Sequence, residues 1–225
     1  MFGVKIDLKH YEESVAHYES APIQKGRILF YGHSLFTRCQ PDNKWQNPNI
    51  EEHILTKDGM PAVLNHGLGG CCADDLLYFY NRMVRPYQPR VLVLAIGGND
   101  ILKGYSATEI IEAFARVVDF ARADFPDIPI YILSSCYGSR YKDPALQNLV
   151  VRRKEFDGYL EVYAKTNGYN FVDMHLAPFF YENDSDIGII EKVREDIFCE
   201  DKGHFNEKGY YLFFDFIKEV LSEHL

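Results

Sequence analysis

The fold is decided by the stretch Val91-Leu92-Val93-Leu94-Ala95-Ile96, which is followed at once by Gly97-Gly98-Asn99-Asp100. Six consecutive apolar residues are typical of a strand that is buried on both faces, as in a parallel sheet covered by helices. The glycines and polar residues that follow mark a tight exit from that strand. The stretch therefore predicts a central parallel strand with a polar turn at its carboxyl end.

Short apolar runs alternate with helical patterns along the rest of the chain. The predicted strands are Arg27–Tyr31, Ala62–Asn65, Val91–Ile96, Ile130–Ser134 and Asn170–Met174. The predicted helices are 11–20, Ala107–Ala123, Ala145–Thr166 and Glu207–Leu221, in which apolar residues recur at helical spacing. Repeated strand–helix–strand order predicts right-handed crossovers and an open, doubly wound α/β sheet of five strands. The irregular stretch 175–203 is expected to be a long surface loop, with room for a short helix.

Length and composition limit the classes of protein. The chain has 225 residues and lacks a Pro/Gly/Ser-rich linker, so residues 1–225 are expected to form a single domain. The formal net charge is -9 and no run of Lys or Arg interrupts it. Since nucleic-acid binding depends on clustered cations, this balance argues against a nucleic-acid partner.

The N-terminal residues, the apolar stretches and the cysteines indicate in which compartment the protein is expected. The N-terminus begins Met1-Phe2-Gly3-Val4 and shows no basic start followed by an apolar run, so no secretory signal is visible. No apolar stretch reaches the ~20 residues that a membrane span needs. The five cysteines are irregularly spaced, which favours reduced, mostly buried thiols over disulfides or a zinc site. We expect a cytoplasmic protein without a membrane span.

Polar motifs follow the predicted strands at the edge where ligands bind in open α/β sheets. Ser34 follows the first strand, Gly67-Leu68-Gly69-Gly70 the second and Asn99 the third, while Asp201-Lys202-Gly203-His204 follows the loop beyond the fifth. Because the carboxyl ends of parallel strands share one edge, these four segments are expected to converge there.

The converging residue types suit acyl transfer. Ser34 is the candidate nucleophile, His204 the candidate base, and Asp201 can orient the imidazole. The Gly70 N–H, the Asn99 side-chain amide and the Ser34 N–H are candidate donors to a developing oxyanion. Simpler readings are a helix N-cap for Ser34 and a surface turn for Asp201 and His204.

Other motifs fail. The sequence Gly32-His33-Ser34-Leu35-Phe36 lacks the second glycine of a G-x-S-x-G elbow, and Cys72 occupies the third glycine position of a dinucleotide fingerprint. His33, His66 and Asp100 are the nearest approach to a metal ligand set, but scattered histidines are more often structural. We therefore expect no metal and no cofactor.

The four motifs together resemble those of the SGNH (GDSL-like) hydrolases, over about residues 11–220. The matching blocks are Phe30–Leu35, Asn65–Gly70, Gly97–Asp100 and Asp201–His204. One departure is His33, which stands where that family usually has Asp; we expect His33 to be structural rather than a second base.

The resemblance implies a flavodoxin-like, three-layer α/β/α fold, no metal, and hydrolysis of carboxylic esters through an acyl-serine intermediate. Its implied site is Ser34, Gly70, Asn99, Asp201 and His204. The expected substrate is a small-molecule ester with a short acyl or acetyl group, an acylated carbohydrate being one candidate. Phe36, Tyr137 and Tyr141 either contact such a substrate or belong to the core. An acyltransferase with the same triad and a non-catalytic binding module are the alternatives. Acyl length and oligomeric state stay open.

Overall fold

The computed structural model describes residues 8–225, so the N-terminal residues from which a cytoplasmic location was expected lie outside the described part. The strands are β1 Ile28–Gly32, β2 Val63–Gly67, β3 Val91–Ala95, β4 Ile130–Leu133 and β5 Asn170–Val172. The helices are α1 Leu8–Ser20, α2 Ser34–Thr37, α3 Ile50–His53, α4 Ala73–Met83, α5 Gly98–Leu102, α6 Ala107–Asp124, α7 Gln147–Thr166 and α8 Glu207–Val220.

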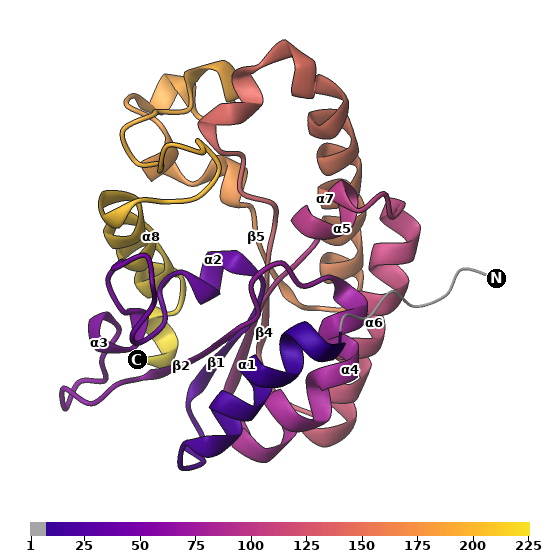
Figure 1. Cartoon of the computed structure of the whole chain (residues 1–225), viewed down its shortest axis with the longest axis vertical. Coiled ribbons are helices and arrows are strands. Elements are labelled where there is room, and N and C mark those ends of the chain that lie inside the picture. The colour runs from indigo at the N-terminus through magenta and orange to yellow at the C-terminus, as the bar shows by residue number, and fades with distance from the viewer. Residues whose placement is uncertain (1–7) are drawn as a thin grey trace.

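All five strands are parallel and lie in the order β2-β1-β3-β4-β5. This is the strand order of flavodoxin-like sheets, with a topological switch between β1 and β3. Figure 1 shows α4, α6 and α7 on one face of the sheet and α8 with the short α2 and α3 on the other. The expected three-layer α/β/α fold with a parallel five-stranded sheet is confirmed.

Alternation of side chains along the strands divides the core into two layers. In β3, Leu92 and Leu94 pack with the layer beneath α4, α6 and α7, whereas Val91, Val93 and Ala95 pack with the layer beneath α8. Every residue of β3 is buried, which is why its sequence is apolar throughout. Strand β3 therefore contributes side chains to both layers of the core, as the apolar run Val91–Ile96 predicts.

Two regions differ from the expected elements. Helix α4 was not predicted, although Leu76, Phe79, Tyr80 and Met83 have helical spacing and are all buried. The stretch 175–203 is irregular and largely exposed, as expected of a surface loop with short helical turns, but some of its apolar side chains complete the layer beneath α8, which was not predicted. These core side chains are Ala177, Phe180, Tyr181, Val193, Ile197 and Phe198. The buried side chains of this segment are thus part of the hydrophobic core.

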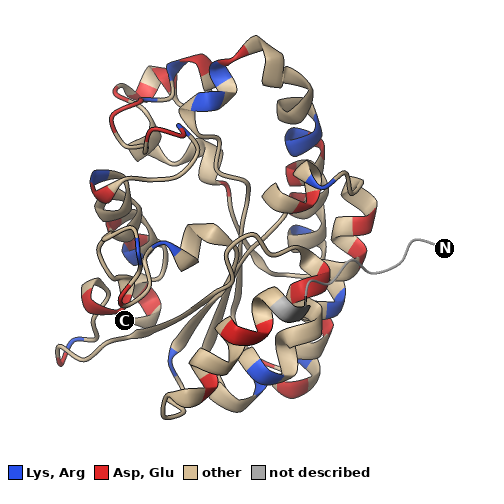
Figure 2. Ribbon diagram, viewed as in Figure 1, with Lys and Arg blue, Asp and Glu red and all other residues tan. Residues whose placement is uncertain are grey.

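The surface carries charge of both signs. In the view of Figure 2, Lys and Arg alternate with Asp and Glu along the helices rather than forming one basic stripe. No helix within residues 8–225 is both long and apolar enough to cross a bilayer.

Candidate active site

Ser34 lies where β1 ends and α2 begins. Close packing fixes this turn, because a Cβ on Gly32 would lie 2.4 Å from the Ala95 carbonyl oxygen of β3. His33, not Ser34, caps α2: its Nδ1 accepts a hydrogen bond from the Leu35 N–H at 3.2 Å. Ser34 is thus the first residue of α2, and its hydroxyl is not used as a helix cap.

His33 has a structural role beside Ser34. Burial, helped by the positive charge of Arg153 and by His204, lowers the pKa of His33 to about 3. A neutral imidazole can keep accepting from the Leu35 N–H at every ordinary pH, whereas a protonated one could not. The departure from the usual Asp therefore leaves an uncharged residue next to Ser34.

His204 is placed between Ser34 and Asp201. Its Nε2 lies 3.1 Å from Ser34 Oγ, and its Nδ1 lies 2.6 Å from Asp201 Oδ2. The other oxygen of Asp201 accepts from the N–H groups of Gly203 and His204 at 2.9 and 3.0 Å. The local turn thus holds the carboxylate in position, and the carboxylate holds the imidazole. The structure brings together Ser34 and His204, which lie 170 residues apart.

The charges of Asp201 and His204 follow from their surroundings. Burial alone would raise the pKa of Asp201, but hydrogen bonds from the Gly203 N–H and from His204 lower it to about 2. Burial lowers the pKa of His204 below its ordinary 6.5; the Asp201 hydrogen bond opposes this, while Arg38 and Arg140 reinforce it. At neutral pH the pair is therefore a carboxylate and a neutral imidazole, the state in which a histidine can accept a proton.

The segment after His204 is fixed by the start of α8. The Asn206 side chain caps this helix through the Gly209 N–H at 3.0 Å and donates to the Asp196 and Phe198 carbonyls. Gly209 lies so near the Ile197 carbonyl that a Cβ there would be 2.2 Å from its oxygen. His204 therefore lies in a segment that is held by hydrogen bonds and close packing.

Gly70 lies in the loop after β2, and Asn99 is the second residue of α5, which follows β3. Gly70 has φ +85°, in the left-handed region that favours glycine. Asn99 Nδ2 donates to the Cys71 carbonyl at 3.0 Å, and Lys103 Nζ donates to the Gly70 carbonyl at 3.3 Å. Two side chains of the β3–α6 region thus tether the Gly70–Cys71 turn. Since an amide NH₂ has two donors, Asn99 keeps one for a ligand.

Two cavities meet at these residues. The larger, of about 470 Å³, is lined by Ser34, Gly70, Asn99 and His204 together with the Arg38 and Trp45 side chains. The smaller, of about 130 Å³, is also lined by Ser34, Asn99 and His204. Asp201 lies behind His204. Hydroxyl, imidazole and amide groups therefore converge on space that a small molecule can enter.

The smaller cavity contains residues that the sequence did not reveal. Its wall includes Ser135, which follows β4, and the guanidinium groups of Arg140 and Arg153. Neither arginine belongs to a recognisable motif, and their approach depends on how α7 and the turn before it pack. The three aromatics considered from sequence, Phe36, Tyr137 and Tyr141, are all buried in the core.

The histidine–aspartate set considered for a metal does not form a cluster. His33 caps α2, His66 Nδ1 lies 2.7 Å from the Met83 carbonyl oxygen, and Asp100 accepts from the Ala73 N–H at 2.8 Å. Among residues 8–225, one other group has metal-ligand spacing: Cys72, Asp74 and Asp75.

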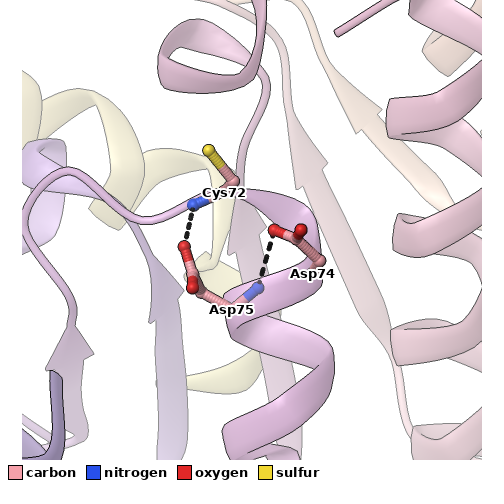
Figure 3. Close-up of side chains that lie close together, drawn as sticks. All are labelled: Cys72, Asp74 and Asp75. Carbon is pink, nitrogen blue, oxygen red and sulfur yellow. Dashed lines mark hydrogen bonds between the residues drawn. The ribbon is translucent and has the colours of Figure 1, made fainter. Parts of the chain in front are cut away.

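Figure 3 shows that this group is the N-terminal cap of α4. Asp75 accepts from the Cys72 N–H at 2.8 Å, and Asp74 accepts from the Asp75 N–H at 3.0 Å. Burial raises the pKa of the Cys72 thiol to about 12, so it stays protonated, whereas a metal needs the thiolate. The hydrogen bonds of the helix end explain these three residues.

Comparison with known proteins places the chain. A model of the GDSL-like lipase/acylhydrolase family matches residues 30–212. A GDSL-like lipase from Bacteroides thetaiotaomicron has a similar structure, with 17% identity, a TM-score of 0.70 and coverage of 97% of this chain and 98% of that one. A lipase/acylhydrolase from Enterococcus faecalis has 18% identity and a TM-score of 0.67, covering 89% of this chain and 97% of that one.

A member of the lipolytic G-D-S-L family from Veillonella parvula is similar at 20% identity and a TM-score of 0.62, covering 87% of this chain and 98% of that one. A search of curated proteins finds no match to the sequence. The structural likeness at these identities concerns the fold, whereas the family model spans most of the sequence. The chain belongs to the GDSL-like lipase/acylhydrolase family.

Proposed function

We propose that this protein is a serine esterase that hydrolyses a carboxylic ester through an acyl-serine intermediate. The observation that carries the proposal is the continuous chain from Ser34 Oγ to His204 Nε2 at 3.1 Å and from His204 Nδ1 to Asp201 Oδ2 at 2.6 Å. A nucleophile within reach of a base, and a base oriented by a third group, is the arrangement that acyl transfer requires.

The reaction would proceed in two halves. His204 takes the Ser34 proton as Oγ attacks the ester carbonyl, and the Ser34 N–H, the Gly70 N–H and the Asn99 amide stabilise the oxyanion. His204 then gives its proton to the leaving alcohol, which departs and leaves an acyl-serine. Water, deprotonated by His204, attacks that ester; the acid is released and Ser34 recovers its proton.

The two cavities suggest how the ester is divided. We assign the acyl group to the smaller cavity, whose volume of about 130 Å³ leaves room for a short chain only. The alcohol would then face the larger cavity, which is lined by Trp45 with Arg38 and Lys44 over its ring and has room for a sugar or another small alcohol. An acetylated carbohydrate fits this division, as do simpler acetate esters.

The test is turnover of chromogenic esters of acetate, butyrate and octanoate by the purified protein. Acetate should give the highest kcat/KM and octanoate the lowest, because the smaller cavity cannot enclose a long chain. Failure to hydrolyse any of them, at any pH between 6 and 9, would contradict the proposal. Adding a small alcohol to the assay distinguishes acyl transfer, since a transferase forms the new ester in preference to free acid.

Asn99→Ala should lower kcat by about 10²- to 10³-fold with little change in KM, as expected for loss of a donor that acts on the transition state. Lys103→Met is the matched control, because it removes the neighbouring tether to the same turn without removing an oxyanion donor. Equal losses in the two variants would show that Asn99 acts only by holding the Gly70–Cys71 turn.

The pH dependence follows from the lowered pKa of His204. The base must be neutral, so kcat/KM for a neutral ester should rise with pH through a midpoint below 6.5 and be level above it. Arg140→Met removes a positive charge that lowers this pKa, so the midpoint should move to higher pH. A wild-type midpoint above 7, or a shift to lower pH in Arg140→Met, would contradict this electrostatic account.

A further inference from the structure

The smaller cavity is lined by two arginines, Arg140 and Arg153, that form no salt bridge within residues 8–225. Arg153, on α7, is only 5% exposed, yet within residues 8–225 no carboxylate oxygen lies within 4.0 Å of its guanidinium. Its Nη1 donates to the Cys136 carbonyl at 3.3 Å, and its Nε has no hydrogen-bond partner in that range. Burying a charge that has no salt-bridge partner is costly, and a bound anion would offset that cost.

The second arginine of this cavity, Arg140, lies in the 3₁₀ turn Ser139–Lys142, which precedes α7. It donates to the Tyr141 hydroxyl at 3.1 Å, but its buried Nε is likewise unpartnered among the described residues. The Arg140 and Arg153 guanidinium carbons lie 5.0 and 4.8 Å from the centre of the same Tyr141 ring. Both guanidinium groups therefore lie against the Tyr141 ring. Their like charges repel each other unless an anion binds to both.

A third donor lies in the same wall. Ser135 is 2% exposed, and its Oγ makes no hydrogen bond of full geometry among the described residues, although its contact with Asp157 opposes the burial-driven rise in the pKa of that carboxyl. Asp157 of α7 interacts electrostatically with Arg153, but its oxygens are already engaged: they accept from the Ser135 N–H at 2.9 Å and from the Tyr137 hydroxyl at 2.7 Å. The lining of the cavity therefore presents two guanidinium Nε–H groups without partners among the described residues and, with His33 neutral, no charged carboxylate.

The two arginines are packed against the catalytic loops themselves. A Cβ on Gly98, the residue before Asn99, would lie 2.8 Å from Arg153 Nη2. A Cβ on Gly203, the residue before His204, would lie 2.9 Å from the Arg140 guanidinium. The Arg140 N–H also donates to the Lys202 carbonyl at 3.0 Å. An anion held here is therefore within a few bonds of an ester carbonyl at Ser34.

We propose that the smaller cavity binds a carboxylate of the substrate through Arg153, Arg140 and the Ser135 hydroxyl. The ester that this protein hydrolyses then carries a negative charge a few bonds from the scissile carbonyl. Planar guanidinium groups match the two oxygens of a carboxylate, and the small cavity suits that group better than a bulkier phosphate. The inference rests on the proposed esterase function and names the class of its substrate.

The carboxylate can belong to either side of the ester, and turnover distinguishes the two. Monoethyl succinate carries it on the acyl side and is compared with neutral ethyl 4-oxopentanoate. O-acetylglycolate carries it on the alcohol side and is compared with O-acetylglycolamide. We expect one charged ester to exceed its neutral partner by about 10- to 100-fold in kcat/KM, the range for hydrogen bonds to a charged group. The acyl-side pair should show it, because we assign the acyl group to this cavity.

Variants of residues in the smaller cavity test whether that cavity causes the preference for the charged ester. Arg153→Met keeps the apolar stem and removes the charge, so the charged-to-neutral ratio should fall to near one. Arg140→Met should lower it too and serves if the buried Arg153 variant does not fold. His33→Asp places a carboxylate in the same cavity and should also lower the ratio. The matched control is Arg152→Met, since Arg152 is the next residue of α7 but donates to the Ile101 and Tyr105 carbonyls instead.

The outcomes separate this inference from the proposed function. Turnover of the neutral esters without any preference in either pair overturns the carboxylate site and leaves the esterase standing. Should no ester be hydrolysed, binding decides: NMR titration should show that wild type prefers succinamate to neutral succinamide and that Arg153→Met does not. Equal binding of the two, or tighter binding of inorganic phosphate than of succinamate, overturns the carboxylate site.

Discussion

Replacement of Ser34 by alanine is expected to lower kcat/KM for a chromogenic acetate ester by about 10⁴-fold or more. The variant keeps the backbone N–H at the start of α2 and the His33 cap, so the oxyanion donors and the fold should persist. Only the attacking oxygen is lost. The remaining rate should therefore be that of an ester bound near His204 and attacked by water.

Ser139→Ala is the matched control for this experiment. Ser139 is buried and its hydroxyl has no partner among the described residues, and it lines neither cavity at Ser34. It should retain wild-type turnover. Comparable rates for Ser34→Ala and wild type would remove Ser34 from the mechanism, whatever the distances around it.

His204→Gln is expected to have the second largest effect, a loss of about 10⁴-fold in kcat/KM. Glutamine can fill the place of the imidazole and donate hydrogen bonds, but it cannot take the Ser34 proton or pass it to the leaving alcohol. The loss should be nearly independent of pH, since the group that titrates in wild type is gone.

The chain contains its own control for the histidine. His53 forms a second imidazole–carboxylate pair, with Nε2 3.1 Å from Asp215 Oδ1 between α3 and α8, and it lines neither cavity. His53→Gln should leave turnover close to wild type. A loss in His204→Gln no larger than in His53→Gln would mean that His204 is not the base.

Much of the fold is readable from the sequence because burial leaves a direct trace in it. The apolar run of β3 predicts a strand covered on both faces, and the alternation of strands and helices predicts the parallel order. Helix α4 was readable too, from the helical spacing of Leu76, Phe79, Tyr80 and Met83, but it was not predicted. The stretch 175–203 was not readable, since its apolar residues follow no period of 2 or 3.6.

Some residues of the candidate site could be predicted from local sequence patterns, and others could not. Ser34, Gly70, Asn99 and the Asp201–His204 pair are each next to a strand end or helix start, so local patterns could place them at one edge of the sheet. Arg140 and Arg153 have no such pattern. Their position depends on α7 packing against Gly98 and on the turn at Arg140 packing against Gly203, and only the assembled fold shows it. The meeting of these residues at one edge of the sheet was therefore predictable, and the charge of the smaller cavity was not.

The central claim is that Ser34 is a nucleophile activated by His204. Intact-protein mass spectrometry after reaction with a fluorophosphonate probe tests it most directly. Wild type should gain the mass of one probe, located on Ser34 by peptide mapping, while Ser34→Ala gains none and His204→Gln reacts far more slowly. An unmodified wild-type protein, or a label that persists in Ser34→Ala, would contradict the account.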